Sequence, residues 1–337
     1  MTAKRATWGA VLLSLALAAS GCGSGGSTTA SSGHDQAHRS GSRAHHAGPA
    51  GPQRLAYRTL FSLPAPLRDP ATAPVGTSQA ALLGGLDAAD TSTSQVYLVS
   101  ARGLVYSGSL PNAQHDAEAA NLAGQVYVFG GGSLTELNHI LGFDPGTHAV
   151  REVGVLPTAS SDSAVTQVGP TAYVVGGYDG TNYLNTILAW QPGGTARVAG
   201  HTPDGLRYAA VTAVGGKVII LGGSTPAGAS RAIYSFDPAT GQVKTIGQLP
   251  QPITHGGAAA LGNYVYLVGG RGDLDTQTTR NVWSIDPNTG AVKVAGSLPN
   301  GLSDAGVLTV GQAIIVAGGS TGTTTLAGVG ELVPGPA

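Results

Sequence analysis

The sequence predicts an all-β chain in which one four-stranded unit is repeated six times. A run of aliphatic or aromatic residues that ends in Gly-Gly returns every 46 to 49 residues, and Leu-Pro pairs and Asp-Pro turns recur in the same phase. The Gly-Gly pairs begin at Gly84, Gly130, Gly176, Gly222, Gly269 and Gly318. Repeats of this length that are built from short strands are typical of propeller blades.

The unit of residues 116–157 shows the strands of one blade. We expect strands at about residues 117–122, 125–129, 139–143 and 149–156. Ala123-Gly124 separates the first two, and Asp144-Pro145-Gly146-Thr147 forms a turn between the last two, since Pro restricts φ and Asp caps the turn. Six such units predict a six-bladed β-propeller over residues 54–337.

The two ends of this domain are expected to close the ring. After Gly318-Gly319 the last unit has one more strand, at about residues 325–333, and then lacks a fourth. Residues 54–64 have the pattern of a fourth strand followed by Leu-Pro, but no unit precedes them. We therefore expect Leu55–Leu63 to pair with the C-terminal blade, because closure removes an exposed edge that would favour aggregation.

The units resemble kelch repeats, and the Gly-Gly pair that ends each second strand carries the resemblance. A third strand rich in aromatic or aliphatic residues joins it, as at residues 183–190, 233–236 and 282–283. Trp190 and Trp283 fit the kelch pattern, whereas Phe143 and Phe236 replace tryptophan in the second and fourth units. The resemblance implies the fold but not the activity, because this fold hosts many functions.

The N-terminal segment predicts export and lipid anchoring. Lys4 and Arg5 precede an apolar run, Trp8 to Ala19, that is shorter than the roughly 20 residues of a membrane-spanning helix and typical of a signal peptide. It ends in Ala19-Ser20-Gly21-Cys22, which resembles the bacterial lipobox, and Cys22 is the only cysteine. We expect residues 1–21 to be a lipoprotein signal peptide, and lipidated Cys22 to anchor the protein on the extracytoplasmic side of the cell membrane. The alternative is an ordinary secretory signal with a chance cysteine.

Residues 22–53 predict a disordered tether between the lipid and the propeller. They are rich in Gly, Ser and His and contain almost no aliphatic residues, so they cannot bury enough surface to offset chain entropy. The histidines of this segment are His34, His38, His45 and His46. Without a fixed scaffold we interpret them as solvated side chains rather than a metal site.

Composition and motifs narrow the function classes. Charged residues make up 10% of the chain and the net charge is -1, which lacks the basic footprint of a nucleic-acid-binding protein. The sequence contains no nucleophile elbow, zinc-protease motif or phosphate-binding glycine loop. We therefore name no catalytic residue and expect no cofactor and no metal site.

One rim of the central channel is the candidate ligand-binding site. The loops between blades and the loops between second and third strands are expected on one face. The first residue of each inner strand is expected to lie at the channel mouth on that face. Fourteen residues before each Gly-Gly, or fifteen where an inserted residue is assumed, lies a titratable side chain. These residues are Asp69, Asp116, Asp162, Arg207, His255 and Asp304; the strict count in the fourth unit reaches Tyr208.

Two interpretations of this rim remain open. The side chains either accept local backbone hydrogen bonds in the turns or form a polar ring that binds a ligand. Four neighbouring carboxylates would raise one another's pKa, and a cation, a water cluster or a polyol would relieve the repulsion. Arg207 and His255 could instead hold a carboxylate or a phosphate.

These features favour a surface-anchored module that binds a glycan, a cell-wall fragment or an envelope protein. Kelch-like propellers also include copper-radical sugar oxidases and a sialic acid epimerase. The oxidase type needs a cysteine cross-linked to tyrosine, which the position of Cys22 excludes. The alternative function is therefore a sugar epimerase or lyase, with His255 as base and Arg207 binding a carboxylate. A structural role in an envelope complex is the third class.

Overall fold

The computed structural model describes residues 51–335. All of these residues belong to one compact unit. The predicted signal peptide, Cys22 and nearly all of the predicted tether lie outside the described residues. Within the described range, no helix has the length and apolar character needed to cross a membrane.

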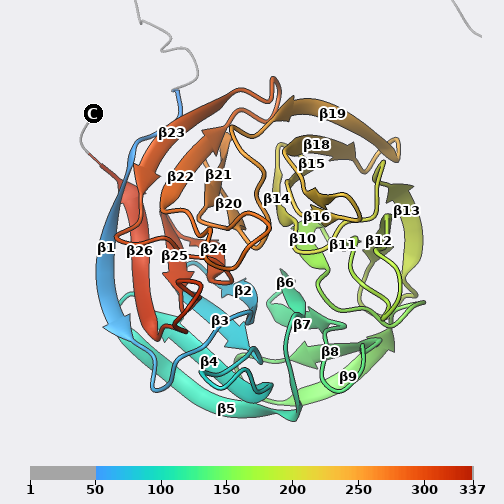
Figure 1. Ribbon diagram of the computed structural model, residues 1–337. Helices are drawn as coiled ribbons and strands as arrows, with labels where there is room; N and C mark the ends of the chain where they lie inside the picture. The colour runs from blue at the N-terminus through green and yellow to red at the C-terminus, as the bar shows by residue number, and fades with distance from the viewer. Residues whose placement is uncertain (1–50, 336–337) are drawn as a thin grey trace, which may run out of the picture. The chain divides into compact units, whose positions relative to one another are not determined.

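Six four-stranded antiparallel sheets surround a central channel, and each sheet forms one blade (Figure 1). From the inner to the outer strand, blade 1 contains β2 (Ala71–Val75), β3 (Gln79–Leu83), β4 (Thr93–Ser100) and β5 (Gly103–Gln114). Blade 2 contains β6 (Glu118–Leu122), β7 (Gln125–Phe129), β8 (His139–Phe143) and β9 (Val150–Val155). Blade 3 contains β10 (Ala164–Val168), β11 (Thr171–Val175), β12 (Thr186–Trp190) and β13 (Arg197–His201).

The remaining blades follow the same order. Blade 4 contains β14 (Ala210–Val214), β15 (Lys217–Leu221), β18 (Ala232–Asp237) and β19 (Gln242–Gln248), and a small hairpin, β16 (Ser224–Thr225) with β17 (Gly228–Ala229), extends its loop. Blade 5 contains β20 (Gly257–Leu261), β21 (Tyr264–Val268), β22 (Asn281–Ile285) and β23 (Val292–Ser297). Blade 6 contains β24 (Gly306–Val310), β25 (Ala313–Ala317), β26 (Gly328–Pro334) and β1 (Leu55–Ser62). The prediction of a six-bladed propeller with four-stranded blades is confirmed.

The ring closes as predicted, through a strand from the beginning of the domain. β1 pairs antiparallel with β26, from Leu55 opposite Pro334 to Ser62 opposite Gly328. Arg58 and Glu331 face each other across this pair and form an ion pair of 2.6 Å. Because β1 is the outermost strand of a sheet whose other strands come from the C-terminus, residues far apart in the sequence lie side by side (Figure 1).

The Gly-Gly repeat marks the place where each blade meets the loop that leaves it. In blade 4, Gly222 has a φ of +60°, and a Cβ atom there would lie 2.1 Å from the carbonyl oxygen of Ile253. The next residue, Gly223, donates its N–H to the same oxygen at 2.8 Å. Gly130, Gly131 and Ser160 repeat this geometry in blade 2. Glycine is therefore required by close backbone approach as well as by positive φ.

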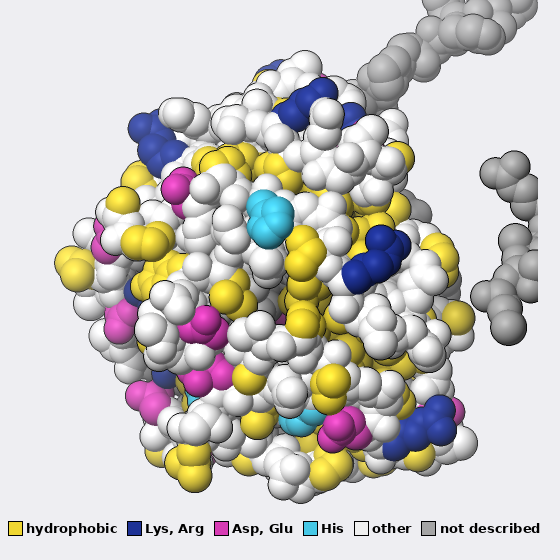
Figure 2. All heavy atoms as spheres, turned by 90° about the vertical axis from the view of Figure 1, so that its right-hand side faces the viewer, with side chains coloured by type: hydrophobic (Ala, Val, Ile, Leu, Met, Phe, Trp, Pro, Cys, Tyr) yellow, Lys and Arg dark blue, Asp and Glu magenta, His cyan; other side chains and the backbone are white. Residues whose placement is uncertain are grey.

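The core lies between neighbouring blades. Trp190 of blade 3 packs edge-on against Tyr127 and Phe129 of blade 2, at ring-centroid distances of 4.9 and 5.4 Å. The leucines of the Leu-Pro repeats are buried at the blade junctions: Leu63, Leu110, Leu156, Leu249 and Leu298. On the outer wall beside β13, basic, acidic and hydrophobic side chains are interspersed (Figure 2).

Candidate functional site at the channel mouth

Six residues at equivalent positions, each two residues before an inner strand, form a ring at one end of the channel. We call them the mouth ring: Asp69, Asp116, Asp162, Tyr208, His255 and Asp304. All have positive φ, between 50° and 59°. Their backbones are joined from blade to blade, since Tyr208 N donates to Asp162 O at 3.0 Å and His255 N to Tyr208 O at 3.1 Å. Aspartate and histidine tolerate this left-handed backbone better than most residues, whereas tyrosine adopts it rarely.

Five of the predicted rim residues lie in the mouth ring, and the placement of Arg207 in it was wrong. Tyr208 occupies the equivalent position, and Arg207 precedes it by one residue. The sequence count assumed one inserted residue in blade 1 and one in blade 4. Only blade 1 has it, because residues 76–78 form a three-residue turn between β2 and β3. In blade 4, Gly215 and Gly216 alone connect β14 to β15, so the strict count was correct there.

The two loop classes share one face, as predicted. The residue before each mouth-ring position pairs with the loop between the second and third strands of the following blade. Arg68 pairs with Leu86, Arg207 with Ser224, and Thr254 with Arg271. This pairing brings the side chains of Arg68, Arg207 and Arg271 around the mouth ring. Of these three arginines, the sequence predicted only Arg207 as a site residue.

Arg207 lies among three tyrosines and binds a mouth-ring carboxylate. Its guanidinium carbon is 4.3 Å from the ring centroid of Tyr178 and 5.1 Å from those of Tyr183 and Tyr208. Its Nε and Nη2 donate to Oδ2 of Asp162, whose side chain is 1% exposed. Burial opposes the charge of Arg207, but Asp162 and the other groups around it raise its pKa above the usual value.

Burial and neighbouring carboxyls raise the pKa of two other mouth-ring residues, Asp69 and Asp116. Burial, followed by the charges of Asp304 and Asp116, raises the pKa of Asp69 well above its usual range. Burial and Asp162 do the same to the pKa of Asp116. Asp304 is the neighbouring charge that raises the pKa of Asp69 most, and Asp162 has this role for Asp116. Neighbouring carboxylates repel each other, so each pair favours a proton on one of its two carboxyls.

His255 is held as a neutral ring. It stacks on Tyr208 with centroids 3.7 Å apart, and Arg271 Nη2 donates to its Nε2 at 3.1 Å. Because Nε2 accepts, the proton lies on Nδ1, which donates to Thr254 Oγ1 at 3.0 Å. Burial, Arg271 and Arg207 lower the pKa of His255 well below its usual value.

The contacts of the carboxyl groups bear on the two interpretations of the rim. Within residues 51–335, the hydrogen bonds to these carboxyls come from side chains: Arg207 to Asp162, Tyr208 to Asp116, and Ser303 to Asp304. The local backbone bonds of the first interpretation are not among them. No three His, Cys, Asp or Glu side chains of this part of the chain are grouped to hold a metal ion.

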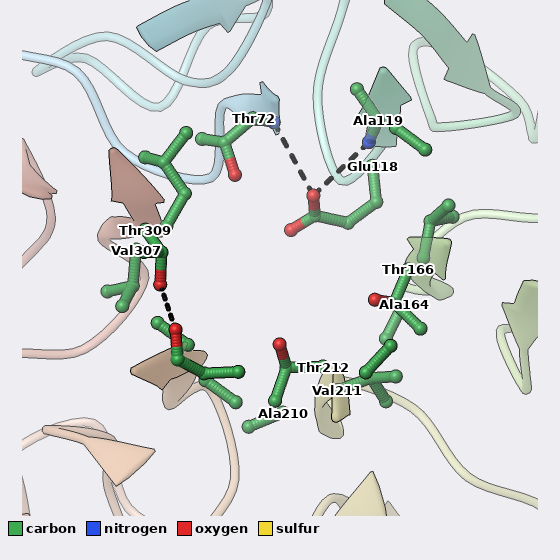
Figure 3. A pocket seen from close by; sticks show the side chains of 18 of the residues that line it. Thr72, Glu118, Ala119, Ala164, Thr166, Ala210, Val211, Thr212, Val307 and Thr309 are labelled. Carbon is green, nitrogen blue, oxygen red and sulfur yellow. Dashed lines mark hydrogen bonds between the residues drawn. The ribbon is translucent and has the colours of Figure 1, made fainter. Parts of the chain in front are cut away.

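The channel continues behind the mouth ring. A cavity of about 70 Å³ lies at the ring, and one of about 400 Å³ follows between the inner strands. Glu118 lines both cavities and projects into the larger one (Figure 3). Sequence reasoning missed this residue, although a signal existed. The other units carry Ala or Gly at its position: Ala71, Ala164, Ala210, Gly257 and Gly306.

Comparison with known proteins agrees with this architecture. The kelch motif model matches residues 205–250 and 252–299, which contain blades 4 and 5. The fold is that of a six-bladed β-propeller, and the kelch motif model matches two of its blades. Among solved structures, the chain resembles the one titled "Structure of YjhT", with a TM-score of 0.70 and 16% sequence identity over 81% of this chain and 96% of that chain. At this identity the likeness concerns the fold. No curated protein matches the chain in sequence.

Proposed function

We propose that this protein is a membrane-anchored, extracytoplasmic binding module whose ligand-binding surface is the channel mouth. The observation that carries the proposal is the cluster of Arg207, Tyr178 and Tyr183 beside the mouth ring. Loops on a rigid scaffold are where binding residues concentrate. Here, both loop classes converge on a ring of buried polar side chains.

The side chains at the mouth favour a hydroxyl-rich ligand, such as a glycan or a cell-wall fragment. Tyr178 and Tyr183 are half-buried and meet edge to face, with centroids 6.0 Å apart, so each presents both an apolar surface and a hydroxyl. Ser224, which is half-buried, adds one hydroxyl, and the buried hydroxyl of Thr254 holds it at 2.8 Å. Hydroxyls and protonated carboxyls both donate and accept hydrogen bonds, which suits a polyhydroxylated partner.

The same geometry favours binding over the epimerase or lyase alternative. That alternative needs Arg207 to hold a substrate carboxylate. Its Nε and Nη2, which form the edge that carboxylates engage in pairs, face Asp162 instead. His255, the base of that scheme, accepts from Arg271 through Nε2, so its lone pair is engaged as well.

The anchoring part of the proposal rests on the order of Lys4, Arg5, the apolar run and Cys22. Metabolic labelling with radioactive palmitate in the native host tests it. We expect the label and the membrane association to disappear in Cys22→Ser. Equal membrane retention of the variant would contradict lipid anchoring.

A glycan array probed with the chain from Gly23 onward tests the ligand class. We expect one structurally related group of glycans to bind. Tyr183→Ala should weaken binding about 10- to 100-fold, as loss of an aromatic contact at a binding surface does. Tyr264→Ala, at the start of β21 and at the other end of the inner strands, is the matched control. A silent array would overturn the glycan assignment and direct the search to an envelope protein.

A further inference from the structure

The central channel behind the mouth ring contains one carboxyl group in a wall of small and hydroxylated residues. Glu118 begins β6, and its side chain projects toward the middle of the cavity (Figure 3). Thr72, Thr166 and Thr212 line the same cavity from blades 1, 3 and 4. At about 400 Å³, the cavity falls within the size range of small-molecule pockets, roughly 300–1,000 Å³.

The protein offers few hydrogen bonds that would compensate for burying a charged Glu118 carboxylate. Its Oε2 accepts from the N–H groups of Ala119 and Thr72 at 3.3 and 3.4 Å, which is long for hydrogen bonds to a charged group. Oε1 points into the cavity (Figure 3). Burial raises the pKa of Glu118 to about 8, and the two backbone N–H groups only partly oppose this. A partner that supplies positive charge and N–H donors would relieve the cost of ionisation.

The remaining walls offer hydroxyl groups and unpaired backbone edges. Each inner strand pairs with one neighbour only, so its other edge, with backbone N–H and C=O groups, faces the channel. Thr309 Oγ1 already donates to one such carbonyl, that of Ala260, at 2.6 Å. The described residues hold no group of three or more metal-ligating side chains, so the wall does not suit a divalent metal. A single carboxylate with hydroxyl and carbonyl oxygens in the same cavity suits an ammonium group, which carries three donors.

We propose that the channel is a second binding site, separate from the mouth surface, that takes a small hydroxylated primary amine. Its ammonium group binds Oε1 of Glu118, and its hydroxyl group binds the threonine hydroxyls and backbone edges of the inner strands. This site does not depend on the glycan proposal, because it uses neither Tyr178 nor Tyr183. The ligand belongs to a different chemical class as well.

Isothermal titration calorimetry with ethanolamine tests the proposal, and ethylene glycol serves as the uncharged match. At about pH 7 we expect ethanolamine to bind and ethylene glycol not to bind. Glu118→Gln should weaken ethanolamine binding about tenfold or more, as expected for loss of a charge-assisted hydrogen bond. Glu152→Gln, at an exposed glutamate of β9, is the control and should bind like the unmodified protein.

A second measurement uses no substitution, so it does not depend on whether Glu118→Gln folds. Because the bound amine needs ionised Glu118, binding at about pH 7 should release protons, which phosphate and HEPES buffers reveal as different apparent heats. Affinity should fall sharply at about pH 5.5, where Glu118 is protonated. Equal binding of ethylene glycol, unchanged binding by Glu118→Gln, or absence of ethanolamine binding at both pH values would each overturn the proposal. Tyr183→Ala should leave ethanolamine binding unchanged, which separates this test from that of the mouth.

Discussion

Arg207 and Asp162 join two neighbouring blades at the channel mouth. Arg207 lies in the loop that leads into blade 4, and Asp162 lies in the loop that leads into blade 3. The guanidinium group of Arg207 forms an ion pair with the carboxylate of Asp162. The arginine side chain is 22% exposed and that of Asp162 only 1%, so the carboxyl group of Asp162 is shielded from solvent and meets Arg207 instead. Removing one member of a buried ion pair leaves an uncompensated charge, which costs more than the pair contributes.

Arg207→Ala should therefore destabilise the protein. We expect its free energy of unfolding to fall by about 2 to 4 kcal/mol, somewhat less than for a fully buried pair because Arg207 is partly solvated. Adding Asp162→Asn should recover part of the loss, since it removes the isolated charge. Urea unfolding of both variants measures this, and Arg102→Ala, at an exposed turn, is the control. A double variant no more stable than Arg207→Ala would show that the tyrosine contacts, not the ion pair, dominate.

Glu118 predicts a pH dependence of stability. Its pKa is raised from about 4.5 to about 8, so the folded chain holds a proton that the unfolded chain releases between these values. This contribution to stability is present at low pH and is lost as the pH rises through about 8. His255 and His115, whose pKa values are lowered from 6.5, act in the opposite direction, but only below about pH 6.5. The range above that value therefore isolates the carboxyl groups.

Between about pH 6.5 and 8.5, we expect the free energy of unfolding to fall by about 1 to 2 kcal/mol on account of Glu118. Glu118→Gln should remove that part of the slope, while Glu152→Gln should retain it. Urea unfolding at several pH values measures the slopes. The raised pKa values of Asp69 and Asp116 act in the same direction and remain in both variants. Identical slopes for the protein and Glu118→Gln would exclude Glu118 as the responsible group.

Alanine substitutions at two glycines of blade 4 should distinguish the cost of backbone strain from the cost of steric conflict. Gly222 and Gly215 have φ values of +60° and +59°, yet a Cβ atom at Gly222 would lie 2.1 Å from Ile253 O, whereas nothing lies within 4 Å at Gly215. Gly215→Ala should cost about 1 to 2 kcal/mol from the left-handed backbone alone. Gly222→Ala should cost at least about 3 kcal/mol, because a backbone carbonyl must also move. Thermal unfolding of the two variants compares them, and similar losses would contradict a separate steric contribution.

The pairing of β1 with β26 should protect the sheet edge of blade 6. A chain that begins at residue 64 lacks β1 and exposes the outer edge of β26. We expect it to aggregate or to form larger species, because an unpaired strand edge is a template for association. Size-exclusion chromatography with light scattering measures this against a chain that begins at Gln53. A monomeric, stable truncated chain would show that closure does not need this strand.

Most of the architecture could be predicted because it depends on residues that are close together in the sequence. Strands of a blade pair with their neighbours in the sequence, and Gly-Gly, Asp-Pro and Leu-Pro mark strand ends through backbone requirements. The strands of blade 2 accordingly lie within two residues of their predicted bounds. The error at Arg207 arose because an insertion was assumed in blade 4 that its two-glycine turn does not contain.

The sequence by itself determined the number of blades, their strands and the strand that closes the ring, because each depends on residues close together in the chain or on a periodic pattern. Only the tertiary structure decided which side chains meet at the channel. Arg207 reaches Asp162 and three tyrosines, and among the described residues that line the channel Glu118 is the one that projects a carboxyl group between the inner strands. These contacts depend on how the blades are rotated about a common axis and on side-chain directions, which no spacing along the chain specifies.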